Sequence, residues 1–201
     1  DYLIIAPQKF HQSLSSFIEM KESQGFKIGL VSPQEIYDSI NSGFPSPNAI
    51  KEFIQQTYIK NDEGLKYVLL VGDYSYENLD YTQYIDYVPS HFIQTTTMGE
   101  TISDFLYTDF DLDHYPDIAI GRVPASTPDQ LEIWIEKVQR YEENIPDYWK
   151  NISVIADGSD TIYQQVAEDF LSEFNAEVEP GLWVEPARND LDQIFSTPDS
   201  L

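Results

Sequence analysis

The chain has 201 residues, of which 41% are hydrophobic and 14% aromatic, so its composition excludes a disordered protein and provides for a substantial core. Its 35 acidic residues against 11 basic ones give a formal net charge of −24, which excludes nucleic acids and anionic lipids as partners because phosphate binding relies on clustered Lys and Arg. Cysteine is absent, which excludes disulfides and thiolate metal sites. No apolar run approaches the roughly 18 residues of a membrane-spanning helix, so no membrane contact is expected.

The chain begins with short apolar strands that alternate with amphipathic helices, the pattern of a parallel α/β sheet. Residues Tyr2 to Ala6 predict a buried strand. The helix that follows carries Leu14 and Phe17 and ends near Gly25, where the missing Cβ permits a left-handed cap. A second strand is predicted from Phe26 to Val31.

The next two helices are both predicted to begin with a hydroxyl residue followed by proline. Ser32-Pro33-Gln34-Glu35 combines a capping hydroxyl, a proline at the first helical position and a carboxylate at the third. Ser46-Pro47 repeats the hydroxyl and the proline, and its helix carries Ile50 and Ile54 on one face. The segment Tyr67 to Asp73 then predicts a central strand buried on both faces.

The composition changes between Tyr74 and Asp113, where residues rich in Tyr, Thr and Asp predict hairpin and loop structure. A strand is expected from Ile118 to Gly121, and Thr127-Pro128-Asp129-Gln130 begins another helix. The apolar stripe of that helix consists of Leu131, Ile135, Val138 and Tyr141. The segment Asn144 to Trp149 breaks the helix, so we place a domain boundary there, with a first α/β domain over residues 1–148 and a second over residues 149–201.

The residues after this boundary predict one strand and one helix. The strand runs from Asn151 to Ala156, and the helix from Tyr163 to Phe174. The apolar residues that we expect this helix to turn inward are Val166, Phe170, Leu171 and Phe174. Because two or three strands cannot bury the faces of a sheet by themselves, we expect this tail to be the truncated beginning of a second domain.

The densest group of carboxylates follows the predicted hairpin, at Asp104, Asp109, Asp111, Asp113 and Asp117. Hard oxygen ligands at alternating positions suit calcium, and the candidate ligands are Asp104, Asp109, Asp111 and Asp113. The segment is not an EF-hand, because His114 and Ile120 stand where that loop needs a glycine and a chelating glutamate. A solvated acidic loop explains the same residues, and the sequence leaves both interpretations open.

Motifs of serine hydrolases, phosphate-binding loops, dinucleotide-binding folds and zinc peptidases are absent. His11, His91 and His114 form no local cluster, so we expect a surface or core role for each of them. Asp73 follows a predicted parallel strand, where acidic residues often face a ligand crevice. It would equally serve to end the strand and cap a turn.

Four segments of the chain occur in a characteristic order. They are the opening Tyr2-Leu3-Ile4-Ile5, the strand Tyr67 to Asp73, the pair Ser103-Asp104 followed by Tyr107, and the segment Pro116 to Arg122. Each motif alone is weak, but in this order they resemble the gingipain-like (C25) cysteine peptidases across much of the chain.

The resemblance implies a three-layer α/β/α fold with a mostly parallel sheet and two caspase-like subdomains, of which the second carries the catalytic His and Cys. It implies a polypeptide substrate, a secreted or cell-surface protein, and a structural calcium ion. Ser159-Asp160 resembles the segment that holds the acidic residue of the primary specificity pocket in Arg-specific members, so Asp160 is the candidate substrate-binding residue. Capping of the next helix is the alternative role for Asp160.

The expected function is therefore that of the N-terminal portion of a gingipain-like cysteine endopeptidase. Because the 201 residues contain no cysteine, they are expected to be inactive alone. The alternative is a non-enzymatic calcium-binding or protein-interaction module derived from the same fold.

Overall fold

The computed structural model describes residues 1–62, 64–74, 88–96, 99–143, 152–156, 161–172 and 180–184. The chain folds into two compact units, which comprise residues 1–140 and residues 141–201. The predicted helix break at Asn144 to Trp149 lies outside the described residues. The assignment of the second unit to a catalytic subdomain stays a prediction.

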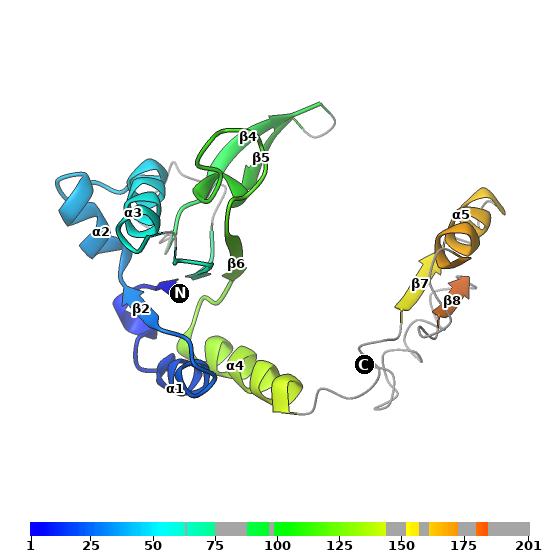
Figure 1. Cartoon of the computed structure of the whole chain (residues 1–201), viewed down its shortest axis with the longest axis horizontal. Helices are drawn as coiled ribbons and strands as arrows, with labels where there is room; N and C mark the ends of the chain where they lie inside the picture. Colours follow the sequence, from blue (N-terminus) through cyan, green and yellow to red (C-terminus); the bar gives the residue numbers. More distant parts are fainter. Residues whose placement is uncertain are drawn as a thin grey trace. The chain divides into compact units, whose positions relative to one another are not determined.

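A four-stranded parallel sheet forms the centre of the first unit (Figure 1). Its order is β2-β1-β3-β6, with β1 at Tyr2–Ile5, β2 at Ile28–Val31, β3 at Tyr67–Val71 and β6 at Ala119–Val123. Every neighbouring pair of strands in this sheet is parallel. The four strands predicted from apolar runs in this part of the chain are thereby confirmed.

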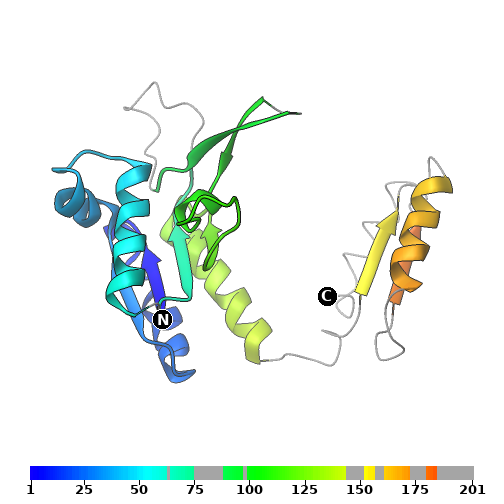
Figure 2. The same ribbon diagram turned by 45° about the horizontal axis from the view of Figure 1, so that its top comes forward.

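Helices cover both faces of the sheet, which gives the three-layer α/β/α arrangement (Figures 1 and 2). One face is covered by α1 (Ser15–Ser23) and α4 (Pro128–Glu143), the other by α2 (Pro33–Ile40) and α3 (Pro47–Lys60). Because side chains alternate across a strand, β1 contributes to both cores. Ile4 packs on the side of α1 and α4, whereas Leu3 and Ile5 pack on the side of α2 and α3.

The ends of the first two α-helices follow from local chemistry. Helix α1 comes after a short 3-10 helix, η1 (Gln8–Phe10), and ends at Ser23. It is followed by the predicted Gly25, whose φ of 94° is accessible because glycine lacks a Cβ. Helix α2 has the predicted capping box, in which Ser32 and Glu35 bond to each other's backbone N–H. Helix α3 begins at the predicted Pro47, but the side chain of Ser46 makes no capping hydrogen bond.

An antiparallel hairpin interrupts the alternation of strands and helices between β3 and β6, as the sequence predicts. It consists of β4 (His91–Thr95) and β5 (Gly99–Ser103), and it extends beyond the sheet (Figure 2). A second 3-10 helix, η2 (Phe105–Tyr107), then leads into the acidic loop before β6.

The second unit contains the predicted strand and helix and one further strand. Strand β7 (Ile152–Ala156) pairs in parallel with β8 (Pro180–Val184), and α5 covers Thr161–Ser172. The sequence did not predict β8, because its segment opens with proline and glycine, which are both unfavourable in strands.

The prediction that Val166 and Phe170 face inward is wrong. Val166 and Phe170 of α5 are 61% and 51% exposed, whereas Ala167 is buried. A two-stranded sheet offers too little surface to cover the whole apolar face of the helix. In α4, Leu131 and Ile135 are buried as expected, but Tyr141 near the end of the helix is 55% exposed. The side chains of Leu171 and Phe174 lie outside the described residues.

Candidate functional site

The acidic loop that joins η2 to β6 is closed at its base by a backbone hydrogen bond. The N–H of Asp117 donates to the carbonyl of Thr108 at 2.8 Å. Thr108 and Asp109 are both fully buried, whereas residues 111–117 are exposed. The loop therefore starts inside the protein and returns to β6 along the surface.

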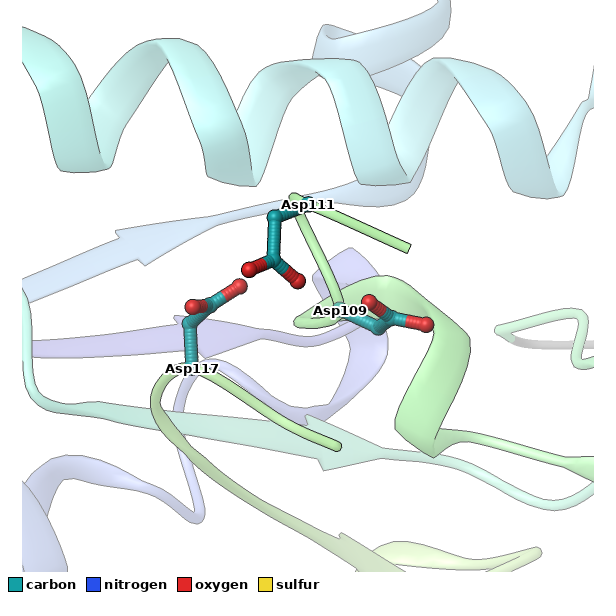
Figure 3. A group of neighbouring side chains, drawn as sticks. All are labelled: Asp109, Asp111 and Asp117. Atoms are coloured by element: carbon teal, nitrogen blue, oxygen red, sulfur yellow. The ribbon is translucent and has the colours of Figure 1, made fainter. Parts of the chain in front are cut away.

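Three carboxylates of this loop lie close together (Figure 3). Asp109, Asp111 and Asp117 each offer an oxygen, and these oxygens all lie within 4.8 Å of one another. Figure 3 shows the carboxylates of Asp111 and Asp117 facing each other, with that of Asp109 on the other side of Asp111. Such a spacing allows one cation to contact all three side chains.

Asp109 is the unusual member of the group because its carboxylate is buried without a partner. The residue is 0% exposed, and among the residues that the structure describes neither carboxylate oxygen finds a hydrogen-bond donor. Removing a charged carboxylate from water costs several kcal/mol unless a charge or hydrogen-bond donor compensates it. A cation bound beside Asp109 would supply this compensation.

The exposed part of the loop is held in shape by its own aspartates. The carboxylates of Asp111 and Asp113 accept hydrogen bonds from backbone N–H groups two residues further on, at 3.1 and 2.8 Å. Asp117 accepts from the N–H of Phe110 at 2.7 Å. The bonds of Asp111 and Asp113 are typical of Asx turns, whereas that of Asp117 spans seven residues, and each occupies one oxygen of its carboxylate.

Helix α3 supports the buried start of the loop. The ammonium group of Lys51 donates to the backbone carbonyl of Asp109 at 2.6 Å. The ring of Tyr58 packs on that of Phe110 with 5.1 Å between their centroids. The position of the carboxylates is thus tied to the core of the first unit.

The residues of this group fit a hard divalent cation of the calcium type. Calcium takes carboxylate, carbonyl and water oxygens in flexible geometry, and the three carboxylates still have free coordination sites after the hydrogen bonds described above. Of the four ligands expected from the sequence, the structure brings Asp109 and Asp111 together. It adds Asp117 to the group, whereas Asp104 pairs with Arg122 and Asp113 is not among the three carboxylates that lie together.

Asp104 is engaged by Arg122 of β6. The guanidinium group donates two parallel hydrogen bonds to the carboxylate, from Nε at 2.6 Å and from Nη2 at 2.8 Å. Ser90 donates to the same carboxylate at 2.7 Å. The remaining guanidinium donors reach the carbonyls of Gly72 and Val88 at 3.1 and 2.7 Å. This bidentate pairing gives Asp104 a fixed cationic partner within the protein.

A half-buried histidine and a buried tyrosine lie next to this ion pair. The rings of His91 and Tyr107 meet edge to face at 4.7 Å, and the Tyr107 hydroxyl donates to the carbonyl of Pro89. Burial raises the pKa of Tyr107 far above its usual range. The pKa of His91 is lowered, mainly by burial and also by Lys51, although Asp104 acts in the opposite direction. No residue in the described part of the chain bonds to Nε2 of His91, and the lowered pKa favours the neutral ring.

The remaining candidates from the sequence do not join the acidic group. Asp73 follows β3 and accepts hydrogen bonds from its neighbour's N–H at 2.8 Å and from the hydroxyl of Ser126 at 3.2 Å. His114 lies in the exposed part of the acidic loop. Asp160 lies outside the described residues, so its proposed role is untested.

Sequence reasoning did not identify Lys51 and Arg122 as parts of these two sites. Their partners are far away along the chain, at Asp109 and Asp104 respectively. The one available signal was the position of Arg122 in the motif Pro116 to Arg122, which carries no information about its partner.

Within the described part of the chain, no helix is both long and apolar enough to cross a membrane.

Comparison with known proteins identifies the family. The model of the family described as Peptidase family C25 matches residues 1–197. Gingipain R2 of Porphyromonas gingivalis is 26% identical over 149 residues, which cover 73% of this chain and 18% of that protein. An uncharacterized protein of Archaeoglobus fulgidus is 25% identical over 156 residues, covering 71% of this chain and 35% of the relative.

Solved structures share the fold. The crystal structure of the Arg-specific cysteine proteinase gingipain R superposes with a TM-score of 0.71 at 22% identity, covering 96% of this chain and 44% of that one. Dimeric latent PorU from Porphyromonas gingivalis gives a TM-score of 0.59 at 20% identity, over 71% of this chain and 16% of that one. The chain thus spans less than half the length of each of these proteins.

Proposed function

Because the chain belongs to peptidase family C25, we propose that it forms the non-catalytic portion of a cysteine-type endopeptidase that acts on polypeptides. One combination carries this proposal: the family model matches residues 1–197, and these residues include no cysteine. The thiolate that attacks the peptide carbonyl would then have to come from another part of the protein. The first unit would serve as the scaffold against which the catalytic part is built.

Asp160 is the residue of this chain that we propose for substrate recognition. A carboxylate accepts two parallel hydrogen bonds from a guanidinium group, which suits selection of arginine before the cleaved bond. The similarity in fold to gingipain R, an Arg-specific cysteine proteinase, supports this choice by analogy. A secreted or cell-surface location, where the acidic surface would aid solubility, belongs to the same proposal.

An activity assay on two proteins tests the peptidase proposal. The 201-residue chain and the full product of its gene are incubated with peptides that contain arginine, lysine or neither, with and without a thiol-alkylating reagent. We expect no cleavage by the 201 residues and thiol-dependent cleavage by the full product. Asp160→Asn in the full product should selectively slow cleavage after arginine. Thiol-independent cleavage by the 201-residue chain, or an inactive full product, would contradict the proposal.

We also propose that the loop around Asp109, Asp111 and Asp117 binds a structural divalent cation of the calcium type. The buried, unpartnered carboxylate of Asp109 carries this proposal, because it needs a positive charge and lies beside two further carboxylates. The bound cation would stabilise the start of the loop and hold it against α3. If the full gene product proves inactive, this site supports the alternative of a non-enzymatic cation-binding module.

Calcium titration of the 201-residue chain tests the cation site. Saturation at about 100 times the Kd should raise the melting temperature of the first unit by about 5–10 °C. Asp109→Asn should weaken binding at least about tenfold, since it removes a full ligand charge. The same variant should melt at or above the temperature of the calcium-free wild type, because a neutral amide replaces a buried carboxylate that has no hydrogen-bond donor among the described residues.

Glu22→Gln is the matched control for this titration, since it removes one negative charge from the exposed surface of α1. It should leave the affinity for calcium unchanged. A flat melting temperature across calcium and chelator, together with no heat of binding, would show that the loop is only a solvated acidic turn.

A further inference from the structure

Lys51 is a basic residue that directly contacts a residue of the candidate cation site. Its ammonium donates to the backbone carbonyl of Asp109 at 2.6 Å, and this hydrogen bond is partly buried. The contact reaches from α3 to the loop across 58 positions of sequence. Lys51 is therefore held at the buried start of the loop.

The ammonium of Lys51 has two effects of opposite sign. It bonds to the loop and places a positive charge near Asp109, whose own carboxylate has no hydrogen-bond partner. Both contributions stabilise the loop when no cation is bound. A divalent cation held by Asp109, Asp111 and Asp117 would instead be repelled by the same ammonium, because Lys51 is bonded to the backbone of one of the three ligand residues and thus keeps a positive charge beside the site.

We propose that Lys51 is an internal competitor of the divalent cation: it holds the acidic loop in place without metal and lowers the affinity of the loop for metal. This inference rests on the cation site proposed above. It assigns to Lys51 a role in setting affinity, so that the loop stays ordered at low calcium and binds calcium only at higher concentrations.

The test uses Lys51→Met in the 201-residue chain, with calcium chloride as the ligand at low ionic strength. Methionine keeps most of the aliphatic stem but lacks the charge and the donor. We expect the variant to bind calcium about tenfold more tightly by isothermal titration calorimetry. In the presence of chelator it should melt about 3–8 °C below the wild type, because the bond to the Asp109 carbonyl is lost.

Two further variants separate charge from packing. Lys51→Arg keeps the positive charge, so its affinity for calcium should remain within about threefold of the wild type. Lys60→Gln removes a positive charge from the far end of the same helix and should leave the affinity unchanged.

The outcomes distinguish the two proposals. If neither the wild type nor any of the variants binds calcium, the cation site itself is refuted. If the wild type binds calcium and Lys51→Met binds it equally or more weakly, the site stands and the competing role of Lys51 is refuted. A lysine that only supports the loop structurally would give this second result, because loosening the loop would lower stability and affinity together.

Discussion

At the scale of single residues, Arg122 connects β6 to the segment before the hairpin and to the residue that precedes η2. Its guanidinium group is 13% exposed and pairs with Asp104, which is 23% exposed. The other donors satisfy backbone carbonyls at Gly72 and Val88. Removing one member of such a pair leaves the other charge without compensation, which is more costly than losing the pair as a whole.

Arg122→Met should therefore lower the free energy of unfolding of the first unit by about 3–5 kcal/mol. Arg122→Lys should fall between the wild type and the methionine variant, since a lysine keeps the charge but cannot donate two parallel bonds. Urea unfolding followed by circular dichroism measures both. Adding Asp104→Asn to Arg122→Met should recover part of the loss, and a fully additive double variant would contradict the assignment of a coupled pair.

His91 makes the stability of the first unit dependent on pH. Its pKa is lowered in the folded protein, first by burial and then by Lys51, so the unfolded chain binds the proton more readily. The contribution of His91 is thus fully present above the unfolded pKa of about 6.5 and is lost as the pH falls below it. His91→Gln, which stays neutral, should flatten the melting temperature between about pH 6.5 and pH 5. An unchanged slope in this variant would mean that other groups cause the loss.

At the scale of elements, the two helix starts at Ser32 and Ser46 show what a sequence pattern predicts and what it leaves open. Both serines precede a proline, and both helices begin where expected. Only Ser32 has a glutamate three positions later, and only Ser32 makes the capping hydrogen bonds. The position of a helix start thus depends on the proline, whereas the cap depends on the reciprocal carboxylate.

Ser32→Ala should cost about 1 kcal/mol of stability, because it leaves a backbone N–H of α2 without its acceptor. Ser46→Ala is the matched comparison. It should lower the free energy of unfolding by only about a few tenths of a kcal/mol, since the side chain of Ser46 makes no capping hydrogen bond. Thermal unfolding of both variants under identical conditions checks the difference. Equal losses would show that the capping box of α2 contributes nothing beyond local helix preference.

At the scale of the whole molecule, the sequence predicts the sheet better than the site. Strands β1 and β3 are recognisable because they are short apolar runs, and burial on both faces demands such runs. The site depends on contacts between distant residues, such as Lys51 with Asp109 and Arg122 with Asp104. Such pairings leave no periodic trace in one sequence, so carboxylate density alone could not separate Asp104 from the group that Asp117 joins.

The acidity of the chain also limits what a calcium effect would mean. A net charge of −24 destabilises any compact state through self-repulsion, and every added salt reduces that repulsion by screening. A rise in melting temperature with calcium chloride is therefore insufficient evidence for a site. A bound ion and a screening ion differ in their dependence on background salt, because a partly buried site is screened much less than the surface.

Raising sodium chloride from about 0.05 M to about 0.5 M should increase the melting temperature of the first unit in the wild type and in Asp109→Asn alike, since it shortens the screening length roughly threefold. At the higher salt, millimolar calcium should still raise the melting temperature of the wild type but not that of Asp109→Asn. The comparison uses melting curves of both proteins at low and high salt, each with and without calcium. The transition of the first unit is the one compared. Should the calcium increment vanish at high salt, the stabilisation would belong to the charge of the whole surface, and the loop would hold no specific ion.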